Sequence, residues 1–122
     1  PSMQRFVDTP MWNRPNAELS WDYYLGEQYQ RGADDVPYHA APARAEDLSG
    51  LPPAYVSTME FDPLRDEGIT YALRLLQAGV ATELHSFSGT FHGSALFATA
   101  EISRREAAEM LAVLRRALRI NA

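Results

Sequence analysis

The amino-acid sequence predicts an α/β protein in which two parallel strands with flanking helices form an incomplete sheet. Residues 54–122 alternate strand and helix patterns in the order strand, helix, strand, helix, which is typical of a β-α-β unit. Residues 1–53 hold seven of the eight prolines and no sustained apolar period, which predicts a loop-rich half with one short helix. At 122 residues, the chain has the length of one domain or part of one.

Two short segments carry the strand prediction. Residues 54–61, AYVSTMEF, combine β-forming and apolar residues between prolines, as a buried strand does. Residues 81–89, ATELHSFSG, predict a second strand with Leu84 on one face and His85 and Phe87 on the other. The helix expected between them implies parallel pairing. A sheet of two parallel strands has two bare edges and little core, so we expect further strands from outside this sequence.

Two helices are expected before the second strand. The first spans residues 17–25, with Asn16 as its N-cap and Gly26 just after its end. The second spans residues 67–78 and ends before Gly79. Helical spacing places four apolar residues on one face of this second helix: Ile69, Ala72, Leu73 and Leu76.

The last helix has an N-terminal signal of its own. Ser103 and Glu106 match the S-x-x-E capping box, in which two side chains bond free backbone donors. An apolar stripe follows at helical spacing: Ala107, Met110, Leu111, Leu114 and Leu118.

Composition excludes several classes of function. The formal charge of −5 argues against binding to nucleic acids or to anionic membranes, which select basic patches. The sequence contains no run of 18 apolar residues, so no membrane span is expected. It has no cysteine, which excludes disulfides and thiolate chemistry and is consistent with a cytoplasmic protein. The first residue is not methionine, which favours a fragment or a processed chain.

Two polar residues follow the predicted strands at their carboxyl ends. Asp62 ends the first strand, and His92 follows the second by a short loop flanked by Gly89 and Gly93. Ligands and catalytic groups gather at this edge of parallel sheets, so the two side chains can meet there. The alternatives remain open: Asp62, before Pro63, can simply cap its turn, and His92 can be a loop histidine bonded to backbone.

A metal site is a weaker alternative. His85, His92 and Asp62 offer suitable ligand types, but His85 projects from a strand face and His92 lies beyond a strand end. We therefore expect no metal and no cofactor. His85 and His39 have no partner in the sequence pattern and are expected to be structural or exposed.

The residues from LPPAYVSTMEFDPLRDEG to FSGTFHGS strongly resemble the C-terminal part of the hormone-sensitive-lipase-like branch of the α/β-hydrolases. That family has a D-P-L-x-x-E segment with the catalytic acid, and a histidine about thirty residues later as general base. The resemblance implies that Asp62 is the acid, with Pro63, Leu64 and Glu67 completing the segment, and that His92 is the base. The upstream segments PMWNRP and WDYYLG also resemble this family, so the similarity covers nearly the whole chain.

The sequence lacks two features of the family. It contains neither the H-G-G-G segment of the oxyanion hole nor the G-x-S-x-G nucleophile elbow. None of the eight serines has that context, and Ser94, after Gly93, is expected to begin a helix. The resemblance therefore implies the C-terminal part of a serine carboxylesterase or lipase, inactive alone, whose complete form acts on a small acyl ester. Three aromatic residues are candidates for the apolar surroundings of the site: Phe87, Phe91 and Phe97.

The alternative function is a truncated, inactive module. Such a module would bind a second copy of itself, or the missing N-terminal part, through its exposed strand edges. The absent elbow favours inactivity of the isolated chain under both hypotheses.

Overall fold

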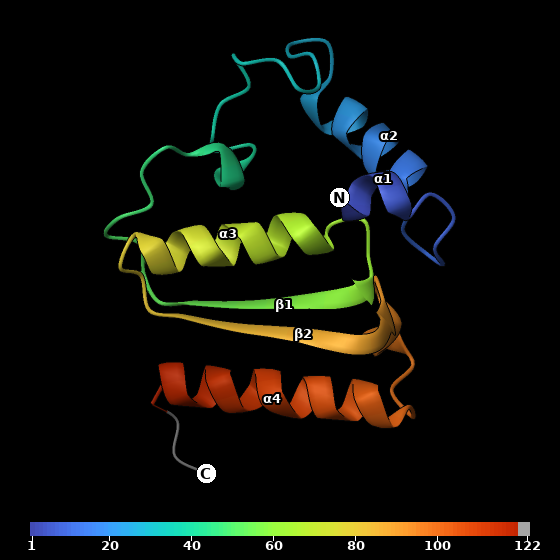
Figure 1. Cartoon of the computed structure of the whole chain (residues 1–122), viewed down its shortest axis with the longest axis vertical. Coiled ribbons are helices and arrows are strands. Elements are labelled where there is room, and N and C mark those ends of the chain that lie inside the picture. Colours follow the sequence, from blue (N-terminus) through green and yellow to red (C-terminus); the bar gives the residue numbers. More distant parts are fainter. Residues whose placement is uncertain (120–122) are drawn as a thin grey trace.

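The computed structural model describes residues 1–119 and has the predicted α/β class (Figure 1). The elements, in chain order, are α1 (Ser2–Arg5), α2 (Arg14–Leu25), the 3₁₀ turn η1 (Pro42–Arg44), β1 (Ala54–Phe61), α3 (Arg65–Gln77), β2 (Thr82–Phe91), the 3₁₀ turn η2 (Ser94–Leu96) and α4 (Glu101–Ala117). The two strands lie side by side, with α3 on one face and α4 on the other (Figure 1). Residues 6–53 run over the α3 side of this sheet.

The strands pair in parallel, as predicted, and the pairing contains one irregularity. The register runs from Ala54 opposite Thr82 to Met59 opposite Phe87, and then shifts so that Phe61 lies opposite Phe91. Two extra residues of β2 are therefore accommodated near its end, as in a β-bulge. Because of this bulge, β2 continues two residues beyond the predicted end at residue 89.

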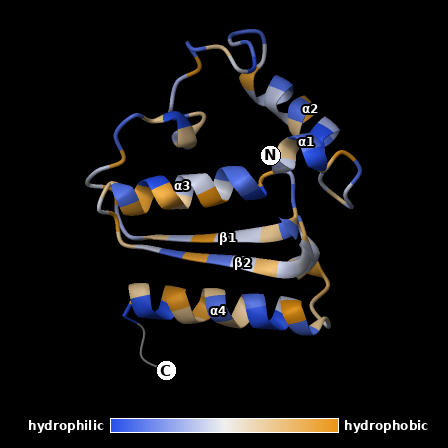
Figure 2. Ribbon diagram, viewed as in Figure 1, coloured by the Kyte–Doolittle hydropathy of each residue, from blue (hydrophilic) through white to orange (hydrophobic). Residues whose placement is uncertain are grey.

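The helix α3 turns a different face to the sheet from the one that its leucines predict. Of the four residues predicted on one face, Ala72 is buried, but Leu73 and Leu76 are 52% and 50% exposed. Leu75, which was not among the four, is buried instead. Gly68 explains the rotation, because a Cβ added there would lie 3.0 Å from Cγ2 of Thr58 on β1. The helix packs on the strand through its small residues. Its larger apolar residues, such as Leu73 and Leu76, therefore remain among polar residues on the exposed side, where Figure 2 shows the two kinds alternating. Leu75 joins a small core cluster with Leu48 and Val80.

The start of α2 lies three residues before the predicted one. Asn13 is the N-cap, and its Oδ1 accepts a hydrogen bond from the backbone N–H of Asn16 at 3.1 Å. The prediction of Asn16 as the cap was therefore wrong. Pro15, which suggested a loop, lies in the first turn of the helix, where proline is compatible with helical geometry. The short helix α1 also lies in a segment predicted as loop.

The helix α4 has no side-chain cap, so the predicted capping box is absent. Its N-cap is Ala100, and Ser103 instead donates a buried hydrogen bond to the carbonyl oxygen of Ser94 at 3.1 Å. The predicted apolar stripe has helical spacing but lies exposed. The partly buried side of α4 contains Ile102, Glu106, Glu109 and Val113.

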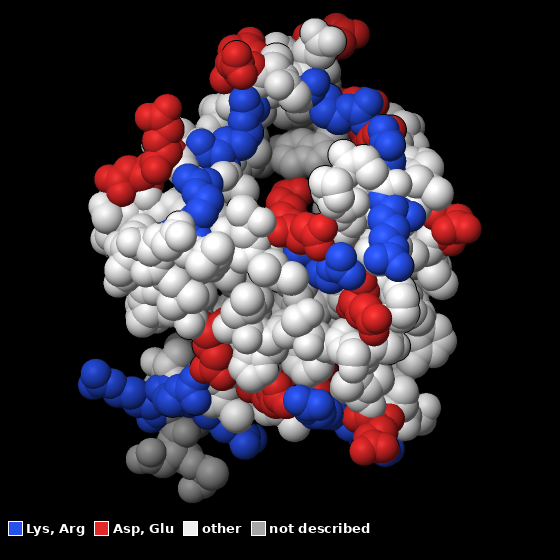
Figure 3. Space-filling view, viewed as in Figure 1, with Lys and Arg blue, Asp and Glu red and all other residues white. Residues whose placement is uncertain are grey.

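Two surface properties bear on function. No helix within residues 1–119 combines the length and the apolar content needed to cross a bilayer. Figure 3 shows arginines interspersed with acidic residues on one face of the molecule, so that face presents no continuous basic patch.

Candidate active site

Asp62 is buried at the carboxyl end of β1, and each oxygen of its side chain has a partner. Oδ1 accepts a hydrogen bond from the backbone N–H of Leu64 at 2.8 Å, as in an Asx-turn. Oδ2 lies 2.8 Å from Nδ1 of His92. The turn-capping role and the pairing with His92 are therefore compatible, because they use different oxygens of one carboxylate.

The bulge in β2 brings His92 to this position. Gly89 has a φ of 72°, in the left-handed region that glycine adopts readily, and its N–H donates to Oε2 of Glu60 at 2.7 Å. Thr90 is fully buried, and its hydroxyl donates to the carbonyl oxygen of Phe87 at 2.6 Å. The bond from Gly89 joins the end of β2 to the end of β1, and the backbone N–H of Glu60 adds a second link by donating to the Thr90 hydroxyl at 3.3 Å. His92 follows immediately after the last residue of β2 and faces Asp62.

The two members of the pair differ in exposure. The Asp62 side chain is 9% exposed and the His92 side chain is 42% exposed. With Nδ1 held by the carboxylate, the imidazole keeps Nε2 for a second partner. A buried carboxylate that orients a partly exposed imidazole is the arrangement of a general base and its orienting acid.

Trp12 forms one side of the site. The strand and helix patterns of the sequence do not predict its position there. Its ring stacks on His92 with centroids 5.5 Å apart and planes at 28°. The backbone that carries it is fixed by a hydrogen bond from the Thr9 hydroxyl to the Trp12 carbonyl oxygen at 2.7 Å. The resemblance included Trp12 in the PMWNRP segment but did not imply this contact.

The residues that follow His92 lie close to the same segment. Gly93 has a φ of 79°, and a Cβ at this position would lie 3.1 Å from Cε of Met11. Ser94 begins η2, as predicted, and is buried with no hydrogen-bond partner on its Oγ among the described residues. Phe91 and Phe97 form an edge-to-face pair at 5.9 Å, next to the histidine. Phe87 is buried in the core on the α4 side.

His85 lies in a different environment and has partners that the sequence pattern did not reveal. Its Nε2 lies 2.8 Å from Oε1 of Glu83, and its Nδ1 lies beside Oε2 of Glu109 on α4. The hydrogen bond to Glu83, aided by Glu109, raises the pKa of His85 above its usual value. His85 is therefore not part of the Asp62–His92 pair. Within residues 1–119, no three acidic or histidine side chains are arranged to hold a metal ion.

Comparisons with known proteins agree with this architecture. The profile of the alpha/beta hydrolase fold family matches residues 1–96. The chain is 40% identical to the carboxylesterase NlhH of Mycobacterium tuberculosis, over 97% of this chain and 37% of that protein. The structure of a bacterial heroin esterase superposes with a TM-score of 0.92 at 70% identity, covering 94% of this chain and 37% of the other. The esterase LipW of Mycobacterium marinum gives a TM-score of 0.87 at 36% identity, covering 96% and 36%.

The chain thus spans about two fifths of the length of the curated carboxylesterase that it matches. The profile covers more than three quarters of its residues, including the Asp62 turn and His92. This chain belongs to the alpha/beta hydrolase fold family.

Proposed function

We propose that this chain is the C-terminal part of a serine carboxylesterase, and that Asp62 and His92 are the acid and the base of its catalytic triad. The contact of 2.8 Å between Oδ2 of Asp62 and Nδ1 of His92 carries the proposal. It joins two residues thirty positions apart at the edge of the sheet where catalytic groups gather. The similarity to carboxylesterases supports the reaction class.

The proposed mechanism uses His92 twice. Its Nε2 first accepts the proton of a serine hydroxyl while the serine oxygen bonds to the ester carbonyl carbon. The imidazolium then gives that proton to the alcohol oxygen as the carbon–oxygen bond breaks and the alcohol leaves. A water molecule attacks the acyl-enzyme along the same proton route and releases the acid and the free serine. Asp62 stabilises the imidazolium and holds the ring orientation in both halves.

The nucleophile belongs to the remainder of a longer protein in this proposal. The 122 residues contain no G-x-S-x-G elbow, and the similar esterases are nearly three times as long. The donors of the oxyanion hole would come from that remainder as well. The isolated chain is therefore proposed to lack esterase activity, and to be cytoplasmic in keeping with its lack of cysteine.

The proposed substrate of the complete enzyme is a small acyl ester. Support comes from the names of the relatives, which include a carboxylesterase and a heroin esterase. The aromatic residues beside the histidine, Trp12 and Phe91, supply apolar surroundings for such a substrate.

Hydrolysis of a short p-nitrophenyl ester tests the proposal. The purified chain and its His92→Ala variant are compared first, and we expect equal background rates. A rate that depends on His92 would mean that a serine of this chain, such as Ser94, or one of a second copy is the nucleophile. In an esterase that contains these residues together with the serine elbow, His92→Ala should remove nearly all of the activity.

A further inference from the structure

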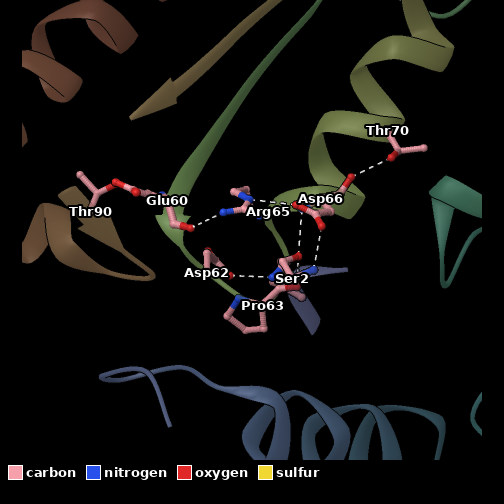
Figure 4. Close-up of polar contacts among 9 residues, drawn as sticks. Ser2, Glu60, Asp62, Pro63, Arg65, Asp66, Thr70 and Thr90 are labelled. Atoms are coloured by element: carbon pink, nitrogen blue, oxygen red, sulfur yellow. Dashed lines mark hydrogen bonds and ion pairs between the residues drawn. The ribbon is translucent and has the colours of Figure 1, made fainter. Parts of the chain in front are cut away.

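We propose that Ser2 is a positioning residue that sets the direction of the Asp62 carboxylate from sixty residues away. This inference rests on the proposed role of the Asp62–His92 pair. Ser2 lies in α1, is 2% exposed and contacts the turn between Asp62 and α3 (Figure 4). No pattern in the sequence indicates this contact.

Three hydrogen bonds join Ser2 to the turn. Its hydroxyl donates to the carbonyl oxygen of Pro63 at 2.8 Å and accepts from the backbone N–H of Asp66 at 3.0 Å. Its own N–H donates to Oδ2 of Asp66 at 2.7 Å. Pro63 is itself fully buried, so water cannot readily replace the serine hydroxyl as its partner.

The bond to Pro63 acts on Asp62 through one peptide group. The carbonyl of Pro63 and the N–H of Leu64 belong to the same planar unit and point in opposite directions. That N–H is the donor that holds Oδ1 of Asp62 at 2.8 Å. When Ser2 fixes the carbonyl, it therefore fixes the N–H, and the carboxylate keeps Oδ2 directed at His92.

The bond to Asp66 replaces a cap that α3 lacks. Leu64 occupies the N-cap position and has no side chain that can accept a hydrogen bond. The Ser2 hydroxyl accepts the N–H of Asp66 in the first turn, so it serves as a cap from a distant segment. Arg65 completes the connection, with bonds to Oδ1 of Asp66 at 2.9 Å and to the carbonyl oxygen of Glu60 at 2.8 Å. The bond from Arg65 lowers the pKa of Asp66 below its usual value, so the carboxylate stays charged.

Nuclear magnetic resonance of the labelled chain tests this inference. The ring nitrogens of His92 report its tautomer at a pH where the imidazole is neutral. In the wild-type chain, the contact with Asp62 should hold the proton on Nδ1. In Ser2→Ala we expect a shift toward the Nε2–H tautomer, and exchange of the Leu64 amide hydrogen with solvent should become about tenfold faster.

Thr70→Ala is the matched control. It also removes a hydroxyl that bonds to Asp66, here from Thr70 to the Asp66 carbonyl oxygen at 2.8 Å, but it leaves the peptide group between Pro63 and Leu64 untouched. We expect the tautomer of His92 and the exchange rate of Leu64 to stay at their wild-type values. Amide exchange in β1 and β2 is recorded in the same samples as a measure of the fold.

The outcomes separate the two proposals. A wild-type His92 with its proton on Nε2 would contradict the proposed function itself. A wild-type proton on Nδ1 that Ser2→Ala leaves unchanged would overturn only the positioning role. Loss of exchange protection throughout β1 and β2 in Ser2→Ala would also overturn it, because Ser2 would then support the whole fold.

Discussion

The indole ring of Trp12 stacks on the imidazole of His92, with ring centroids 5.5 Å apart and planes inclined by 28°. Trp12 precedes α2, whereas His92 follows β2, so the contact joins segments eighty residues apart. The adjacent residues also meet, since Met11 lies against Gly93. The imidazole of His92 is therefore held in two ways: Asp62 contacts its Nδ1, and the N-terminal segment packs against its face.

Replacing Trp12 should loosen His92 while the fold persists. Trp12→Ala removes the stacked ring, and an aromatic contact of this kind contributes about 1 kcal/mol. We expect the Nδ1 proton of His92 to exchange faster with solvent and its resonance to broaden, whereas Trp12→Phe should retain most of the wild-type signal. An unchanged resonance in Trp12→Ala would show that Asp62 alone orients the ring.

Gly93→Ala should change the surroundings of His92, whereas Gly79→Ala should not, although the two variants should lose similar amounts of stability. Gly93 and Gly79 share a φ of 79°, so alanine at either position carries the same backbone strain of about 1–2 kcal/mol. A Cβ at Gly79 has no neighbour within 4 Å, but at Gly93 it meets the end of the Met11 side chain, which is exposed and can move.

We therefore expect similar losses in urea unfolding for the two variants, within about 0.5 kcal/mol. Changes in the His92 and Trp12 resonances should occur in Gly93→Ala alone. A much larger loss of stability in Gly93→Ala would mean that Met11 cannot move aside.

The strands, and the positions of Asp62 and His92 just beyond their ends, could be predicted because these signals are local. A run of β-forming residues between prolines gives the exact bounds of β1, and Asp62 follows directly from where that strand ends. The orientation of α3 and the start of α4 depend on contacts with other elements. Gly68 must approach Thr58, and Ser103 bonds to Ser94 instead of capping its own helix. Spacing within one helix does not contain that information.

The same limit applies to the side chains around the site. The resemblance marked Asp62 and His92, but the contacts of Ser2 and Trp12 depend on how the N-terminal segment folds back on the sheet. The partners of His85 were missed for a related reason, since Glu109 comes from α4.

Asp62→Asn tests the tautomer argument in an esterase that contains this site and its serine. The amide can still accept the Leu64 N–H, so the turn should persist. Its NH₂ group, however, favours a His92 tautomer with the proton on Nε2, which cannot accept the serine proton. We expect kcat for a p-nitrophenyl ester to fall by a factor on the order of 10⁴, with little change in KM. A modest fall in kcat would mean that Asp62 has a structural role only.

The interactions of His85 should make stability depend on pH. The hydrogen bond to Glu83, together with Glu109, raises the pKa of His85. The pKa of Glu83 is lowered chiefly by its bond to His85, and that of Glu109 by Arg105 and His85. A histidine with a raised pKa stabilises the folded chain fully below its unfolded pKa, and this contribution is lost as pH rises through the folded value. The carboxylates contribute above their ordinary pKa, and their contribution is lost as pH falls through the lowered values.

Urea unfolding of the wild-type chain and of His85→Gln at a series of pH values measures this effect. We expect the wild type to have its greatest advantage in mildly acidic solution, and the advantage should shrink as pH rises past the ordinary pKa of histidine, about 6.5. Glutamine keeps hydrogen-bonding capacity without a charge, so it removes the titration and little else. Parallel curves for the two proteins across this range would contradict the assignment.

The isolated chain should associate with itself. β1 pairs only with β2 among the described residues, so its second edge presents free backbone donors and acceptors. Apolar residues that remain exposed add to this tendency, including Leu73 and Leu76 on α3 and Leu111 and Leu114 on α4. Light scattering of the purified chain should therefore give a mass well above the monomer value of 13.6 kDa, increasing with concentration. The double variant Leu111→Glu with Leu114→Glu distinguishes association through α4 from association through the strand edge, because association through the strand edge should survive these changes. A single species at the monomer mass over the whole concentration range would show that neither surface binds a second copy.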